Sequence, residues 1–141
     1  MNINETLKHY FGYDSLRPGQ QELIEGILQR KDVLGIMPTG AGKSLCYQVP
    51  ALMLDGITIV VSPLISLMTD QVKALNQTGV HAAYINSSLT ENQIRTALFY
   101  AAQGRYKIIY VAPERLNTMR FLEFACQVDI SMVTVDEAHC I

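Results

Sequence analysis

The chain has 141 residues, of which 49% are hydrophobic and 17% are charged. This length is enough for one sizeable hydrophobic core and too short for two, so we expect one domain or part of one. The formal net charge of -2 lacks the basic excess that is typical of nucleic-acid-binding domains, so contact with nucleic acid has to be argued from motifs. The longest aliphatic run, Ile57 to Val61, is too short to span a bilayer. The wide spacing of Cys46, Cys126 and Cys140 indicates free buried thiols, and we expect a cytoplasmic protein.

Short runs rich in β-branched residues alternate along the chain with segments of helical spacing. The runs predict strands at Asp32–Met37, Ile57–Ser62, Ala82–Ile85, Lys107–Val111 and Met132–Val135. The predicted helices are Gln20–Leu28, a segment beginning near Lys43, the stripe from Leu64 to Leu75, a segment from Thr90 to Gly104, and a shorter one from Thr118 to Ala125. Because strands alternate with helices and are apolar on both sides, we predict an α/β fold, with a parallel sheet covered by helices on both faces.

The segment Met37–Ser44 lies between a predicted strand and a predicted helix, which is the context that a phosphate-binding loop requires. Gly40 and Gly42 permit a backbone in which successive amide groups point at phosphate oxygens. We expect the Lys43 ammonium between the β and γ phosphates, and the Ser44 hydroxyl on Mg²⁺. The general pattern has glycine at its first position, where this chain has methionine. The alternative interpretation is a glycine turn that caps a helix.

Acidic residues follow the predicted strand Met132–Val135. A carboxylate at a strand tip is a metal site in folds of this kind, and we expect Asp136 to hold Mg²⁺ through its water shell. Glu137, which is adjacent, is the expected catalytic base that accepts a proton from the attacking water or orients it. The alternative is a solvated strand end or a helix cap. His139 stays open between a structural and a chemical role.

Four blocks of the sequence carry a family resemblance: MPTGAGKSLCYQ, VVSPLISLMTDQV, YVAPERL and VDEAHC. In this order they resemble the successive motifs of the RecQ branch of superfamily-two helicases, over nearly the whole chain. The resemblance implies a RecA-like P-loop NTPase sheet, ATP and Mg²⁺ as cofactors, and an ATP-dependent 3'-5' DNA helicase. Its implied partners are single-stranded and duplex DNA, its implied role is in DNA recombination and repair, and its implied location is the cytoplasmic nucleoid of a bacterium.

The resemblance extends upstream to residues 11–20, which are similar to the adenine-reading segment of this family. It implies that the Tyr13 ring stacks on the base, that the Gln20 amide pairs with its edge, and that Arg17 supports this pocket. An amide offers the donor and the acceptor that adenine N7 and N6 require. The alternatives are an ordinary half-buried core aromatic for Tyr13 and a solvated helix position for Gln20. The full set of expected nucleotide-binding residues is Tyr13, Arg17, Gln20, Thr39, Gly40, Ala41, Gly42, Lys43 and Ser44.

For DNA contact, the resemblance points to the start of the helix at Ser62, Pro63 and Leu64, whose free amides suit a backbone phosphate. Arg115 is a further candidate, and an ion pair within the protein is the competing interpretation.

Relatives of this kind continue with parts that this sequence does not contain. The resemblance implies a further strand, which inserts beside the acidic strand, a second RecA-like lobe with an arginine finger, and a zinc-binding region. We therefore expect residues 1–141 to be a partial helicase ATP-binding domain, truncated at its carboxyl end, with an exposed sheet edge. The competing interpretations are a P-loop kinase and a non-catalytic, nucleotide-dependent DNA-binding module. A GTPase is disfavoured because the NKxD guanine motif is absent.

Overall fold

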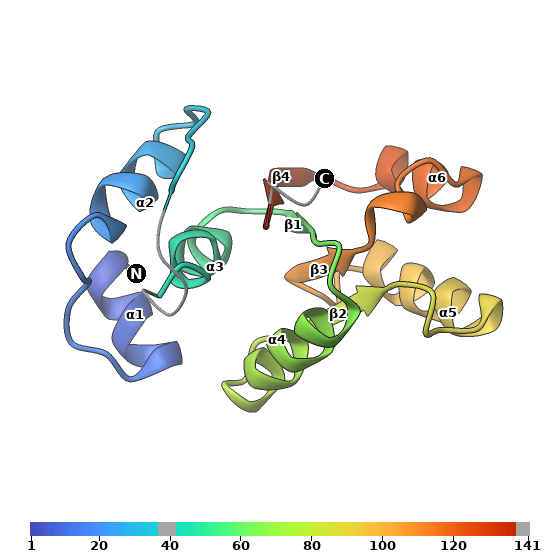
Figure 1. Ribbon diagram of the computed structural model, residues 1–141, viewed down its shortest axis with the longest axis horizontal. Coiled ribbons are helices and arrows are strands. Elements are labelled where there is room, and N and C mark those ends of the chain that lie inside the picture. The colour runs from blue at the N-terminus through green and yellow to red at the C-terminus, as the bar shows by residue number, and fades with distance from the viewer. Residues whose placement is uncertain (37–41, 138–141) are drawn as a thin grey trace. The chain divides into compact units, whose positions relative to one another are not determined.

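The structure is a computed structural model that describes residues 1–36 and 42–137. The chain divides into two compact units, Met1–Asp55 and Gly56–Ile141, and each is described here by itself (Figure 1). The first unit is helical over its described residues. The second contains a parallel sheet.

The first unit is built from three helices: α1 (Ile3–Phe11), α2 (Gln20–Leu28) and α3 (Leu45–Met53). Both α1 and α2 pack against α3. The centre of this packing is formed by Leu7, Ile24 and Val49, one from each helix, and all three are fully buried. Helix α2 has the predicted bounds. Helix α1 was not predicted, although Asn2 and Glu5 form a capping box at its start.

The segment before the phosphate loop differs from the prediction. A strand was expected over Asp32–Met37, but residues 32–36 have no strand conformation, and Met37 lies outside the described part of the chain. The side chains of Leu34 and Ile36 are 80% and 89% exposed. A strand is stabilised by hydrogen bonds to a neighbouring strand, and the described residues of this unit supply none.

The second unit alternates strands with helices. In chain order its elements are β1 (Ile57–Val61), α4 (Ile65–Gln77), β2 (Ala82–Ile85), α5 (Glu91–Ala102), β3 (Ile108–Val111), the 3-10 turn η1 (Pro113–Arg115), α6 (Met119–Gln127) and β4 (Ile130–Val135). The strand order is β2-β3-β1-β4, and every pairing is parallel. Thr90 and Gln93 form the predicted capping box at the start of α5. The predicted elements of this unit are therefore confirmed, with ends that shift by one or two residues.

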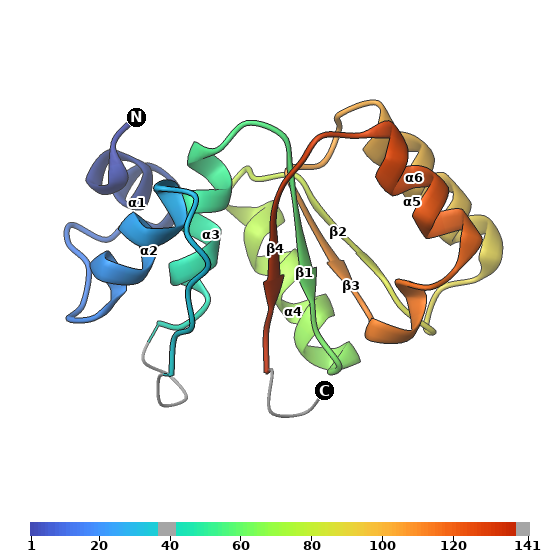
Figure 2. The same cartoon turned by 90° about the horizontal axis from the view of Figure 1, so that it is seen from above.

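Helices cover both faces of this sheet (Figure 2). Ile57, Ile59 and Val61 of β1 belong to a core that α5 and α6 close, with Leu98 and Phe121 among its members. The alternate residues of β1 point to the opposite face, where α4 packs, and they are also buried. Burial on both faces explains the continuous aliphatic run of β1 and confirms the predicted architecture.

Strand β4 lies at one end of the strand order and pairs with β1. Its register sets Val133 opposite Ile59 and Val135 opposite Val61, so the valines lie on the face that α5 and α6 cover further along the sheet. Val133 is nevertheless 61% exposed. Within the described residues of this unit, α5 and α6 therefore leave this face of β4 partly uncovered.

Candidate nucleotide and nucleic-acid sites

Polar side chains gather at the carboxyl ends of the strands in the second unit. Ser62 follows β1, Asn86 follows β2 and Asp136 follows β4. All three are buried. Because every pairing is parallel, these residues lie at the same edge of the sheet, which is where α/β sheets bind ligands.

Asp136 is held at this edge by the sheet itself. Its backbone N–H donates to the Val61 carbonyl at 2.9 Å, which continues the ladder between β4 and β1. Its side chain is 7% exposed, and its Oδ1 accepts a hydrogen bond from the Glu137 backbone N–H at 2.9 Å. Glu137 has a φ of +53°, a left-handed conformation that is costly for a residue with a Cβ.

The residues present fit a site for Mg²⁺ better than one for a metal held entirely by protein. Within residues 1–36 and 42–137, no group of three or more His, Cys, Asp or Glu side chains is arranged to hold a metal ion. Mg²⁺ usually takes one or two carboxylates and completes its shell with water and substrate phosphates. A single buried carboxylate such as Asp136 suits that chemistry. His139 and Cys140 lie outside the described residues.

The end of the phosphate loop is described from Gly42 onward, whereas the expected contacts Thr39, Gly40 and Ala41 lie outside the described residues. Gly42 has a φ of +75°. Ser44 is the N-cap of α3, yet its hydroxyl makes no capping hydrogen bond to the helix. Lys43 and Ser44 are half-buried directly before α3. A hydroxyl that does not cap its helix suits the expected role as a metal ligand.

Gln20 joins the expected adenine segment to the phosphate loop within the first unit. Its Nε2 donates to the Gly42 carbonyl at 3.0 Å, and its Oε1 accepts from the Arg17 backbone N–H at 2.6 Å. The side chain is 1% exposed, so the alternative of a solvated helix position is wrong. A Cβ added at Gly42 would lie 2.3 Å from Gln20 Nε2. Only glycine therefore leaves room for this contact.

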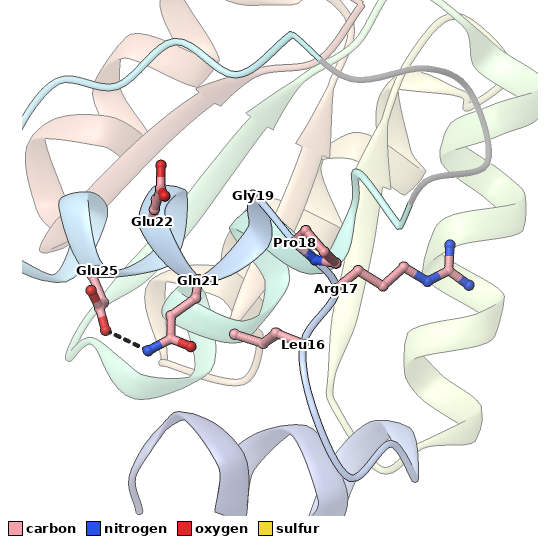
Figure 3. Close-up of a pocket in the computed structure, with 7 residues that line it drawn as sticks. All are labelled: Leu16, Arg17, Pro18, Gly19, Gln21, Glu22 and Glu25. Carbon is pink, nitrogen blue, oxygen red and sulfur yellow. Dashed lines mark hydrogen bonds between the residues drawn. The ribbon is translucent and has the colours of Figure 1, made fainter.

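A pocket of about 390 Å³ lies beside this segment (Figure 3). Its walls are Leu16, Arg17, Pro18, Gly19, Gln21, Glu22 and Glu25. Arg17 extends away from Glu22 and Glu25, and Gln21 donates to Glu25 at 2.8 Å. Tyr13 is 53% exposed, so stacking on a base and the alternative of a half-buried aromatic both stay predictions. The Tyr13 ring is thus exposed at the surface of this unit.

The expected DNA-contact residues lie at the same carboxyl edge as Asp136. Ser62 is buried, and its hydroxyl accepts the Leu64 backbone N–H at 3.4 Å. Helix α4 then starts without a side-chain cap and without an acidic residue in its first turn. Such a helix start favours an anion through its free amides and its dipole. Pro63 is half-buried between these two residues.

Arg115 lies in η1, directly after β3, and it pairs with Glu91 of α5 at 3.3 Å. The same carboxylate lies 3.8 Å from the Arg120 guanidinium. Glu91 therefore provides the ion-pair partner that the competing interpretation of Arg115 expected. Glu91 and Arg120 were not predicted as functional residues. They are far apart in the sequence, and only the folded sheet brings them into contact.

Asn86 was also missed. Its Oδ1 accepts hydrogen bonds from the Ser88 backbone and hydroxyl, and its Nδ2 contacts Met68 Sδ at 3.7 Å. It orders the loop between β2 and α5.

Two of the cysteines are described: Cys46 is a buried free thiol, as expected, and burial raises its pKa. Cys126 is exposed, so its expected burial was wrong.

Comparison with known proteins gives the family. Residues 17–141 match the family model described as DEAD/DEAH box helicase. The chain is 51% identical over 136 residues to the ATP-dependent DNA helicase RecQ of Bacillus subtilis, covering 96% of this chain and 23% of that protein. It is 47% identical to the RecQ of Haemophilus influenzae, covering 96% and 22%, and 44% identical to ATP-dependent DNA helicase Q-like 5 of Arabidopsis thaliana, covering 99% and 15%. The chain thus spans less than a quarter of each relative.

A solved structure shows the same fold. The crystal structure of the DUF1998 helicase MrfA bound to DNA and AMPPNP superposes with a TM-score of 0.77 at 18% identity, over 98% of this chain and 21% of that one. This likeness confirms the RecA-like α/β fold. No helix within the described residues is long and apolar enough to cross a membrane.

Proposed function

Because the chain belongs to the DEAD/DEAH box helicase family, we propose that it forms the ATP-binding part of an ATP-dependent DNA helicase of the RecQ type. The observation that carries this proposal is the position of Asp136. Its carboxylate is buried at the carboxyl end of β4, and a backbone hydrogen bond to Val61 holds it at the ligand-binding edge of a parallel sheet.

In the proposed mechanism, Lys43 neutralises charge on the β and γ phosphates, and Ser44 and Asp136 hold Mg²⁺. Bound Mg²⁺ would offset the charge that builds up on the phosphates. Glu137 accepts the proton of the attacking water or orients that water.

At the other end of the nucleotide, Tyr13 stacks on the adenine, Gln20 reads its edge, and Arg17 supports the pocket. The buried amide of Gln20 already contacts the Gly42 carbonyl. Adenine recognition through Gln20 would require this contact to rearrange. Thr39, Gly40, Ala41 and Gly42 complete the proposed phosphate cradle with their amide groups.

DNA is the proposed partner because the relatives above are named DNA helicases and because α4 begins with uncapped amides. The first turn of α4, which directly follows Ser62–Leu64, presents these amides to a backbone phosphate, and Arg115 adds a positive charge. By resemblance to RecQ helicases, we propose 3'-5' movement on single-stranded DNA, unwinding of the duplex in recombination and repair, and association with a bacterial nucleoid. A second RecA-like lobe and a zinc-binding region would cooperate with this part.

A chimera tests the proposal. Residues 1–141 would replace the aligned segment of the Bacillus subtilis relative, and phosphate release would be measured with and without single-stranded DNA. We expect DNA-stimulated release that Glu137→Gln lowers by about 10²- to 10⁴-fold while ATP affinity is retained. Glu123→Gln, which makes the same charge change at an exposed position of α6, is the control. A chimera that binds ATP and DNA but hydrolyses equally with Gln at position 137 would indicate a non-catalytic binding module.

A further inference from the structure

Two arginines share one carboxylate at the sheet edge, outside the set of residues assigned to hydrolysis. Glu91, the first residue of α5, lies 3.3 Å from the Arg115 guanidinium and 3.8 Å from that of Arg120. The cluster therefore holds two positive charges and one negative charge. It is locally positive on a chain whose formal net charge is -2.

From this cluster we propose that Arg115 and Arg120 together form a binding site for a backbone phosphate of single-stranded DNA, and that Glu91 occupies this site when no strand is bound. The proposal rests on the proposed function, because it takes DNA as the ligand. It adds a second arginine to the proposed DNA-contact residues. It also adds a competing carboxylate that lowers the affinity for single-stranded DNA.

The topology sets the cluster beside the proposed DNA path. Strands β1, β3 and β2 are neighbours in that order, and their carboxyl ends lead to α4, η1 and α5. The uncapped start of α4, the turn that carries Arg115 and the first residue of α5 therefore follow one another along the same edge of the sheet. A strand that meets the amides at the start of α4 and continues along this edge reaches the arginines next.

The geometry favours exchange of the carboxylate for a phosphate. Both nitrogen-to-oxygen distances exceed those of strong charge-assisted pairs, which are about 2.7 to 2.9 Å. The Glu91 side chain is 66% exposed, and exposed ion pairs contribute little to stability. A phosphate offers a planar guanidinium the same kind of oxygen acceptor, so it can replace the carboxylate.

Arg120 has a contact that does not depend on the carboxylate. Its guanidinium also donates to the backbone carbonyl of Glu91 at 3.3 Å. When the Glu91 side chain turns away, this hydrogen bond keeps Arg120 beside the start of α5. Arg115 is more restricted than Arg120, since its side chain is 23% exposed and it lies in a turn fixed by the end of β3. Both cations are therefore kept in place for a phosphate.

Glu91 has a second role that the test must separate. An acidic residue in the first turn stabilises a helix through the dipole, whatever binds nearby. Glu91→Gln removes that effect together with the competing charge. A loss of helix stability lowers the melting temperature, whereas loss of a competing charge raises DNA affinity. The two effects are thus measured by different quantities.

The experiment is fluorescence anisotropy of a labelled oligo-deoxythymidine with the full 141-residue chain, at several salt concentrations. One lost phosphate contact lowers the slope of log affinity against log salt by about 0.7, which is about eightfold in affinity at 50 mM and about threefold at 200 mM. We expect this loss for Arg115→Ala and for Arg120→Ala. For Glu91→Gln we expect affinity to rise about threefold, the effect of one charge about 6 Å away in water.

Matched controls are available on the same elements. Glu123→Gln on α6 makes the same charge change, and Arg105→Ala removes a cation that stacks on Tyr100 near the other end of α5. Both should leave DNA affinity within about twofold. The gain from Glu91→Gln should also vanish when Arg115 and Arg120 are both replaced by alanine.

The outcomes separate the two proposals. If the parent chain binds the oligonucleotide but Glu91→Gln does not tighten binding, or tightens it no more than Glu123→Gln does, the competing carboxylate is refuted. If either arginine variant keeps the parent slope while its circular dichroism spectrum is unchanged, the two-arginine site is refuted. A folded parent chain that binds neither ATP nor the oligonucleotide would refute the proposed function itself.

Discussion

Two segments of this chain that were both predicted to be strands have different structures. Residues 57–61, with the sequence ITIVV, form the fully buried strand β1, which has a partner on each side. Residues 32–36, with the sequence DVLGI, have no strand conformation, and Ile36 is 89% exposed. Strand β4 is intermediate, because it pairs on one side and leaves Val133 largely exposed. Side-chain composition thus indicates which segments can form strands, and neighbours decide which of them do.

The comparison is tested most strongly by removing the same side chain from both segments. Ile59→Ala empties a site that is 2% exposed, so we expect unfolding to become easier by about 2 to 5 kcal/mol. Ile36→Ala removes an exposed side chain and should change the free energy of unfolding by less than about 0.5 kcal/mol. Urea unfolding measures both. Equal costs would show that residues 32–36 are packed in solution.

Two glycines with nearly the same backbone conformation test the contact between Gln20 and the phosphate loop. Gly42 and Gly12 have φ values of +75° and +76°, so alanine at either position costs about 1 to 2 kcal/mol of backbone strain. At Gly42 the added Cβ also meets Gln20 Nε2, whereas nothing lies within 4 Å at Gly12. We expect Gly42→Ala to be the more destabilising in thermal unfolding. It alone should weaken binding of a fluorescent ATP analogue, and similar behaviour of the two variants would contradict the contact.

Neighbouring glutamines provide a smaller contrast. Gln20→Ala removes two part-buried hydrogen bonds of a buried amide, to the Gly42 carbonyl and from the Arg17 N–H, at an expected cost of about 1 to 3 kcal/mol. Gln21→Ala removes an exposed hydrogen bond to Glu25 and should cost less than about 0.5 kcal/mol. Chemical denaturation of both variants measures the difference. A difference near zero would mean that the Gln20 amide is not held as described.

The smallest effect on stability is expected at the edge strand. Val133→Lys places a charge on an exposed edge position, so the free energy of unfolding should change by less than about 0.5 kcal/mol. Self-association should fall, because charged edge residues oppose pairing between sheets. Sedimentation velocity at increasing concentration measures this. Unchanged association together with intact folding would show that the β4 edge is not the surface that associates.

The elements of the second unit were predictable because their signals are local. The Thr90 and Gln93 capping box, the aliphatic run of β1 and the glycine stops describe short-range physics that the fold retains. The segment at residues 32–36 was mispredicted because its state depends on a neighbour that local sequence does not specify. The contacts of Glu91 with Arg115 and Arg120 were not predictable, since 24 and 29 residues separate the partners and the sheet order brings them together.

The central claim is that Lys43 and Asp136 act on the same triphosphate, and paramagnetic broadening tests it most directly. With Mn²⁺ in place of Mg²⁺ and a non-hydrolysable ATP analogue, amide NMR signals close to the metal broaden. The account predicts loss of the signals of Gly42–Ser44 and of Asp136–Glu137 together, while those of Gly12 and Gly104 persist. Broadening at only one of the two segments, with nucleotide bound, would contradict it.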